Sequence, residues 1–213
     1  GLLETAYKAF ENAGIRIEEA AGSRTSVHIG SFTHDWRDIL QRDPLMDVSY
    51  IATATEVSML ASRLSWFYDL SGPSISLDTA CSSSLMALHL ACQSLKSREA
   101  DMGLVGGANL LLDPVGVIGI TNVGMLSPDG ISYSFDHRAN GYARGEGFGV
   151  VVIKRLDDAL RHGDTIRGIV RATGSNQDGR TPGITQPDGA AQEELIRDTY
   201  KAAGLDMRLV RYS

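Results

Sequence analysis

The sequence predicts an α/β fold in which sheets are covered by helices. Short β-prone runs alternate along the chain with segments whose apolar residues recur at helical spacing, as in α/β folds. The clearest unit is a β-prone run over 74–77, bounded by Gly-Pro and Asp-Thr, followed by an apolar segment over 85–95. The length of 213 residues, 43% of them hydrophobic, suits one large domain or part of one.

Six segments are predicted to be helical or nearly so. The first carries apolar residues three and four positions apart and is followed by Gly14, a natural helix stop. The segment 85–95 is apolar on nearly every face, so we expect it to be buried in the centre of the domain. The helical segments are 2–13, 56–70, 85–95, 156–163 and 190–204, and 114–123 forms a short helix or a turn.

Strands and loops separate these helices. A loop as long as 124–146 in a compact domain is usually functional. The residues Tyr212 and Ser213 read as the entry to a further strand. The predicted strands are 25–30, 74–77, 100–112, 148–154 and 166–175, and the predicted loops are an irregular surface excursion over 32–47, the loop 124–146 and a Gly- and Pro-rich loop over 176–189.

Composition excludes several classes of protein. A formal charge of −6 argues against a general nucleic-acid surface, and the absence of a run of eighteen apolar residues predicts no membrane span. The two cysteines cannot pair with each other, which fits a reducing compartment, and we expect a cytoplasmic protein. No His/Cys spacing fits zinc, so we expect neither a metal nor a directly bound cofactor.

Cys81 is the candidate nucleophile. The helix that contains 85–95 is predicted to begin at Cys81, where unpaired backbone N–H groups and the helix dipole favour thiolate over thiol. A small buried hydrophobic residue is the alternative for a free cysteine, and position alone does not decide between them. Cys92 lies eleven positions later and is interpreted as core filler.

A nucleophilic cysteine normally needs a base or cation beside it, and no histidine of this chain fits that role. His89 is eight positions along the same helix, more than two turns away. His28 falls in a predicted buried strand, whereas His34, His137 and His162 fall in polar segments where solvation is the default interpretation.

The run Asp-Thr-Ala-Cys-Ser-Ser-Ser-Leu over 78–85 resembles the active-site signature of β-ketoacyl synthases, specifically the ketosynthase domain of type I polyketide synthases. The resemblance implies a thiolase-like layered αβαβα fold, of which this chain would be the N-terminal half. Periodicity alone leaves a doubly wound sheet equally open. The resemblance also implies that Cys81 carries the growing acyl chain as a thioester.

The resemblance extends over nearly the whole chain. Residues 65–68 and 136–142 are most similar to the iterative, reducing polyketide synthases of filamentous fungi. The further segments that resemble the family are 2–4, 11–15, 63–70, 87–95, 106–109, 126–130, 135–136, 141–147 and 176–179.

The chain also departs from the family pattern. It has Thr53-Ala54 where the family usually has Thr-Gly. The family's two catalytic histidines lie in a downstream His-Gly-Thr-Gly-Thr segment and a later Gly-His segment, neither of which this chain contains. Because the chain also opens in what reads as a helix without Met, we expect residues 1–213 to be a β-ketoacyl synthase N-terminal domain cut at both ends and inactive alone.

The resemblance implies an acyltransferase that forms carbon–carbon bonds. Cys81 would accept an acyl group from an acyl carrier protein, whose phosphopantetheine carries the acyl and malonyl substrates. Decarboxylative condensation would then give a β-ketoacyl thioester, with the Cys81 backbone N–H as one oxyanion donor. The implied partners are the carrier, adjoining polyketide synthase domains and a second copy, with strand 102–112 near the dimer interface or in the central sheet.

Two alternatives remain beside this interpretation. One is a non-catalytic ketosynthase-like subunit that serves dimerisation or chain-length control, although such subunits typically lack the cysteine. The other is a cysteine hydrolase on an α/β scaffold.

Overall fold

A computed structural model describes residues 1–43, 45 and 49–210 of the chain. It contains two compact units, Gly1–Arg155 and Leu156–Ser213. No helix among the described residues is long and apolar enough to cross a membrane.

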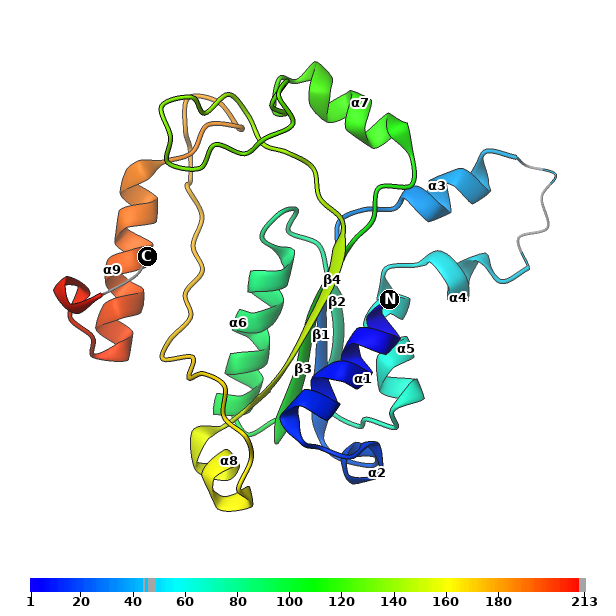
Figure 1. The fold of residues 1–213 in the computed structure, drawn as a ribbon, viewed down its shortest axis with the longest axis vertical. Helices are drawn as coiled ribbons and strands as arrows, with labels where there is room; N and C mark the ends of the chain where they lie inside the picture. Colours follow the sequence, from blue (N-terminus) through cyan, green and yellow to red (C-terminus); the bar gives the residue numbers. More distant parts are fainter. Residues whose placement is uncertain (44, 46–48, 211–213) are drawn as a thin grey trace. The chain divides into compact units, whose positions relative to one another are not determined.

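The first unit is built on a four-stranded sheet with the order β2-β1-β3-β4 (Figure 1). Its strands are β1 (Thr25–Gly30), β2 (Ser74–Leu77), β3 (Met102–Asn109) and β4 (Gly147–Lys154). The first three are parallel, and β4 runs antiparallel to β3. Gly30 pairs with both Leu77 and Gly107, so the carboxyl ends of the three parallel strands meet at one edge of the sheet.

Helices cover both faces of this sheet, as Figure 1 shows. On one face, α1 (Leu2–Ala13) and α5 (Ser58–Phe67) enclose the main core, and α6 (Ser83–Lys96) packs on the other face. Alternation along the strands divides the side chains between the two cores. The main core contains Phe10, Val27, Ile29, Leu64, Tyr68 and Leu104, whereas Val105 packs with the α6 side.

Among the described residues, α6 is buried on the face that packs on the sheet and open on the other, so the expectation of a helix buried in the domain centre stays a prediction. Its buried residues are mostly small, whereas Leu85 remains 71% exposed. The buried face consists of Ser83, Ala87, Ala91, Ser94 and Leu95.

The sequence did not predict three short helices, one before β1 and two between β1 and β2. They are α2 (Ile17–Ala20), α3 (Asp35–Gln41) and α4 (Ile51–Thr55). The predicted irregular excursion over 32–47 therefore contains α3, and residues 44 and 46–48 of it lie outside the described part of the chain. The α3 helix is held by the Asp35 carboxylate, which accepts the backbone N–H groups of Leu112 and Asp113.

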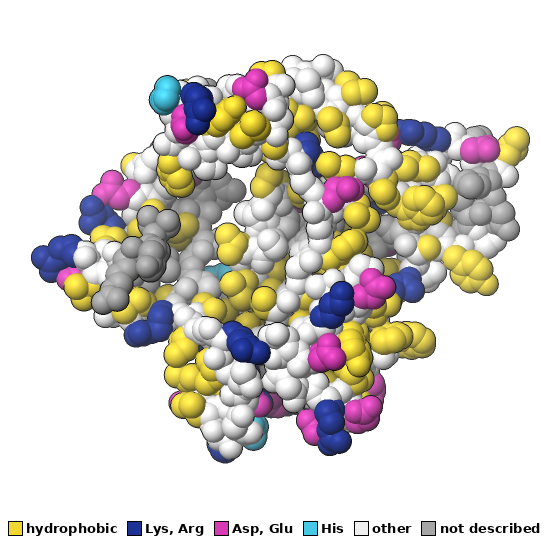
Figure 2. All heavy atoms as spheres, viewed as in Figure 1, with side chains coloured by type: hydrophobic (Ala, Val, Ile, Leu, Met, Phe, Trp, Pro, Cys, Tyr) yellow, Lys and Arg dark blue, Asp and Glu magenta, His cyan; other side chains and the backbone are white. Residues whose placement is uncertain are grey.

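After β3 the chain forms α7 (Pro114–Asn122), capped by the Asp113 side chain. None of its residues is buried, and Val115 and Ile118 are exposed. In the view of Figure 2, yellow apolar side chains gather over this helix.

The long loop that follows contains neither helix nor strand over 123–146, as predicted. Its two ends are joined by the pairing of Leu126 with Tyr142. Near its tip Arg138 binds the Asp136 carboxylate and stacks over the Tyr133 ring.

The second unit contains α8 (Leu156–His162), α9 (Gly189–Ala203) and the 3-10 helix η1 (Met207–Leu209). The Asp188 side chain caps α9. The predicted strand over 166–175 is wrong. That segment is extended but has no strand neighbour among the described residues, and it lies along α9, where Arg171 donates to the Ala203 carbonyl. The strand expected to begin at Tyr212 and Ser213 lies outside the described residues.

Candidate active site

Cys81 lies in the turn that joins β2 to α6, at the carboxyl edge of the sheet. Its side chain is exposed, whereas Cys92, inside α6, is half-buried. The helix begins at Ser83 rather than at the cysteine, two residues later than predicted. The structure therefore places the candidate nucleophile on the turn that leads into the helix.

This turn contains a residue in a strained backbone conformation. Ala80 has φ of 57°, in the left-handed region that costs a non-glycine residue about 1–2 kcal/mol. Strained conformations persist only where the surroundings hold them, and they cluster at functional sites.

Side chains on both sides of the turn hold Ala80 in place. The Asp78 carboxylate Oδ1 accepts the Ala80 N–H at 2.8 Å. The Ser83 hydroxyl donates to the Ala80 carbonyl at 2.6 Å and accepts the Thr79 N–H at 2.9 Å. Ser83 is only 3% exposed, so its end of these hydrogen bonds is shielded from water.

The first turn of α6 lies directly against the backbone of two strands. A Cβ added at Gly30 would lie 2.4 Å from the carbonyl carbon of Ser83 and 2.5 Å from the backbone nitrogen of Ser84. A Cβ added at Gly107 would lie 2.9 Å from the Ser84 Cβ. Glycine in these two strands therefore sets how closely the helix, and with it the Cys81 turn, approaches the sheet.

Other segments reach the same edge of the sheet. At the end of β3, the Asn109 amide donates to the Gly145 carbonyl, and the Glu146 carboxylate accepts the Leu111 N–H at 2.6 Å. The end of the 124–146 loop is therefore anchored where the parallel strands end, which is the edge where α/β sheets usually bind ligands.

The histidines of the first unit lie on other segments than the Cys81 turn. His89 is eight residues along α6, roughly 12 Å along its axis by helix geometry. His28 is buried in β1, and its burial lowers the pKa of the imidazole. His34 precedes α3, His137 is exposed beside Asp136, and His162 ends α8 in the second unit.

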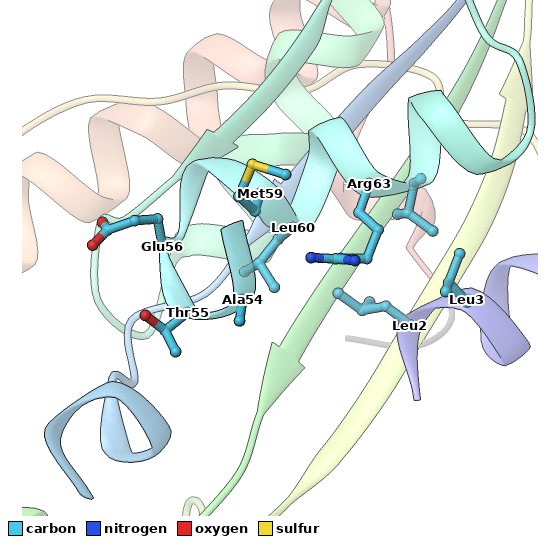
Figure 3. A pocket seen from close by; sticks show the side chains of 9 residues that line it. Leu2, Leu3, Ala54, Thr55, Glu56, Met59, Leu60 and Arg63 are labelled. Atoms are coloured by element: carbon cyan, nitrogen blue, oxygen red, sulfur yellow. The ribbon is translucent and has the colours of Figure 1, made fainter. Parts of the chain in front are cut away.

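A cavity of about 100 Å³ lies between α1, α4 and α5, with the Arg63 side chain reaching across it (Figure 3). It is smaller than the roughly 300–1,000 Å³ typical of small-molecule sites, and Cys81 does not line it. Its lining consists of Leu2, Leu3, Ala54, Thr55, Glu56, Met59, Leu60, Arg63 and Leu64. Over the described part of the chain, no three His, Cys, Asp or Glu side chains are grouped so that they could hold a metal ion.

Comparison with known proteins identifies the family. The family model for the N-terminal domain of β-ketoacyl synthases matches residues 1–159, and the model for the C-terminal domain matches residues 167–213. The chain belongs to the β-ketoacyl synthase family. The resemblance inferred from the 78–85 motif is thereby confirmed.

Relatives of this ketosynthase chain include fungal reducing polyketide synthases, which agrees with the predicted subtype. It is 53% identical over 212 residues to a highly reducing polyketide synthase of a Cryptosporiopsis species. It is 55% identical over 212 residues to a reducing polyketide synthase of Alternaria solani. The alignments cover 100% and 99% of this chain, but the chain spans only 9% of either relative's length.

A solved structure confirms the ketosynthase fold. The ketosynthase from module 6 of the bacillaene synthase of Bacillus subtilis 168 matches with a TM-score of 0.88 and 41% identity, covering 96% of this chain and 34% of that one. The prediction of a thiolase-like fold is confirmed, and the described residues of the first unit supply three of its layers, helix, sheet and helix. A cysteine hydrolase is not favoured, because both family models and this structure point to condensing enzymes.

The hydrogen-bonding residues around the ketosynthase cysteine were missed by sequence reasoning. The 78–85 motif contains Asp78 and Ser83, but it does not show which backbone groups their side chains bind. A signal was present nonetheless, because an Asp two residues before Ala80 is the arrangement of an Asx turn. That pattern predicts a turn, but it does not reveal the left-handed conformation that the turn imposes on Ala80.

Proposed function

We propose that this chain is the N-terminal part of a polyketide synthase ketosynthase and that Cys81 is its catalytic nucleophile. The observation that carries the proposal is the exposed Cys81 thiol on a strained turn at the carboxyl edge of the sheet, in a chain of the β-ketoacyl synthase family. A strained strand-to-helix turn is a recurring way to present a nucleophile clear of its own backbone.

In the first step the Cys81 sulfur attacks the carbonyl carbon of an acyl thioester held on the phosphopantetheine of an acyl carrier protein. The carbon–sulfur bond to the carrier breaks, the carrier thiol takes the proton, and an acyl-cysteine remains. The backbone N–H of Cys81, next to the start of α6, is the proposed donor to the oxyanion that forms.

In the second step a malonyl-carrier thioester loses carbon dioxide. The resulting carbanion attacks the acyl-cysteine carbonyl, a carbon–carbon bond forms, and the Cys81 thiolate leaves. The product is a β-ketoacyl thioester on the carrier. The base and the second oxyanion donor are assigned to residues outside 1–213, in the two histidine segments that the family resemblance implies, so we expect this segment alone to be inactive.

The proposal includes a homodimer, a cytoplasmic location and adjoining polyketide synthase domains. Because β3 lies between β1 and β4, it cannot accept a further strand. The earlier expectation that this strand lies in the central sheet therefore fits the structure. Any strand pairing with a second copy would use β2 or β4, the two edges of the sheet.

Condensation assays on a protein containing the whole ketosynthase region test the proposal. Acyl- and malonyl-carrier thioesters are supplied, and carbon dioxide and β-ketoacyl product are measured separately. We expect Cys81→Ala to abolish the β-ketoacyl product and Cys92→Ala, the matched control, to retain it. Product formation by Cys81→Ala would contradict the assignment, and a protein with no condensation at all would favour the non-catalytic subunit.

A further inference from the structure

We propose that Asp78 and Ser83 are positioning residues that hold the Cys81 turn in its reactive geometry by fixing Ala80. The inference rests on the proposed function, because it concerns the placement of the proposed nucleophile. Neither side chain is proposed to react with substrate.

The two side chains fix the peptide groups on either side of Ala80. Asp78 accepts its N–H, and Ser83 donates to its carbonyl from both the hydroxyl, at 2.6 Å, and the backbone N–H, at 3.0 Å. The residue bound in this way is the one with the unfavourable φ of 57°, immediately before Cys81. The direction in which Cys81 leaves the turn therefore depends on these bonds.

Ser83 also connects the turn to the sheet. Its backbone lies where a Cβ on Gly30 would be only 2.4 Å away, so it cannot move toward β1. Its hydroxyl additionally accepts the Thr79 N–H, which binds the residue two positions before the cysteine. The backbone of Ser83 is thus held by its contact with β1, and the Ser83 side chain holds the backbone that precedes Cys81.

Ser82 provides a matched control beside Cys81. Its hydroxyl donates to the Thr79 carbonyl at 2.9 Å and pairs with the Thr79 hydroxyl at 2.8 Å. Replacing Ser82 by alanine thus removes as many side-chain hydrogen bonds as replacing Ser83. The difference is that Ser82 is exposed and its side chain makes neither of the bonds at Ala80.

Two reactions of Cys81 distinguish the alignment of its sulfur from the accessibility of its thiolate. Transfer of an acyl group to Cys81 from a carrier thioester requires the sulfur to be aligned with the bound carbonyl, whereas alkylation by iodoacetamide requires only an accessible thiolate. In the protein containing the whole ketosynthase region, we expect Ser83→Ala to slow acyl transfer by roughly 10- to 100-fold, the range for a reacting group displaced by up to about 1 Å. Alkylation of Cys81 should change by less than about threefold, because access is unaltered.

Rescue by glycine distinguishes positioning from general stabilisation. Glycine adopts a positive φ without strain, so Ala80→Gly makes the bonds from Ser83 less necessary. We therefore expect Ser83→Ala to cost much less acyl transfer in the Ala80→Gly background than in the native one, a non-additive result. Equal costs in the two backgrounds would overturn the proposal.

A second pair of variants applies even where Ser83→Ala does not fold. Asp78 is exposed, so its replacement leaves the core intact. Asp78→Asn keeps the Oδ1 acceptor and should retain acyl transfer, whereas Asp78→Ala removes it and should slow acyl transfer with little change in alkylation. Equal rates in these two variants, or equal rates in Ser82→Ala and Ser83→Ala, would overturn the inference while leaving the proposed function intact. A native protein whose Cys81 is never acylated would overturn both.

Discussion

The close approach of α6 to β1 gives a prediction whose size follows from the structure. An alanine Cβ at position 30 would lie 2.4 Å from the Ser83 carbonyl carbon, whereas ordinary contact begins at 3.4 Å, so the helix start must withdraw by 3.4 − 2.4 = 1.0 Å. The obstructing atoms are backbone, which cannot rotate away as a side chain can. Because overpacking costs about 1–3 kcal/mol and this contact is severe, we expect Gly30→Ala to destabilise the ketosynthase region by about 3 kcal/mol.

The assay is thermal unfolding of the protein with and without the substitution. Domains of about 150–250 residues lose about 2–4 °C per kcal/mol, and larger ones lose less, so the midpoint of the ketosynthase region should fall by at most roughly 6–12 °C. Gly149→Ala is the matched control: it lies in the same sheet, but its added Cβ would meet nothing within 4 Å. It should change stability by less than about 0.5 kcal/mol. If Gly30→Ala were as stable as Gly149→Ala, the account of how the Cys81 turn is seated would be wrong.

Three further predictions concern other parts of the first unit. Because Cys81 is exposed and burial raises the pKa of the Cys92 thiol, iodoacetamide should label Cys81 first, as peptide mapping would show. The labelling rate of Cys92 should approach that of Cys81 only as the pH rises. Preferential labelling of Cys92 at neutral pH would contradict this. The Arg155 side chain, 18% exposed, binds the backbone carbonyls of Leu95 in α6 and of Ala100 after it, as well as the Asp101 carboxylate. Arg155→Met should therefore cost about 1.5–3 kcal/mol in denaturant unfolding, whereas Arg24→Met, on the exposed side of the same carboxylate, should cost less than about 1 kcal/mol. Equal costs would be inconsistent with this view. In sedimentation at micromolar concentration the ketosynthase region should be a dimer, and a monomer would count against the proposed assembly.

Elements with strong local signals could be predicted from the sequence. The strands Thr25–Gly30 and Ser74–Leu77 have the predicted bounds, because apolar or β-branched runs end at Gly, Pro or Asp. The helix Leu2–Ala13 also has its predicted bounds, since its apolar residues keep helical spacing and Gly14 takes the left-handed conformation, φ 73°.

Features set by tertiary contacts could not be predicted. A strand needs a hydrogen-bonding neighbour, and residues 166–175 have none among the described residues, although their sequence is β-prone. The candidate nucleophile was identified from its motif, whereas the proposed roles of Asp78 and Ser83 depend on the φ of Ala80, which the sequence does not reveal.

The central claim, that Cys81 is the residue that carries the acyl chain, is tested most directly by trapping the acyl-enzyme. A protein containing the whole ketosynthase region is incubated with an acyl-carrier thioester alone, so that condensation cannot follow, and the adduct is mapped by peptide mass spectrometry. The account predicts one acyl group per chain, attached to Cys81 and absent from the Cys81→Ala variant. An acyl group found on another residue, or one that persists in Cys81→Ala, would contradict it.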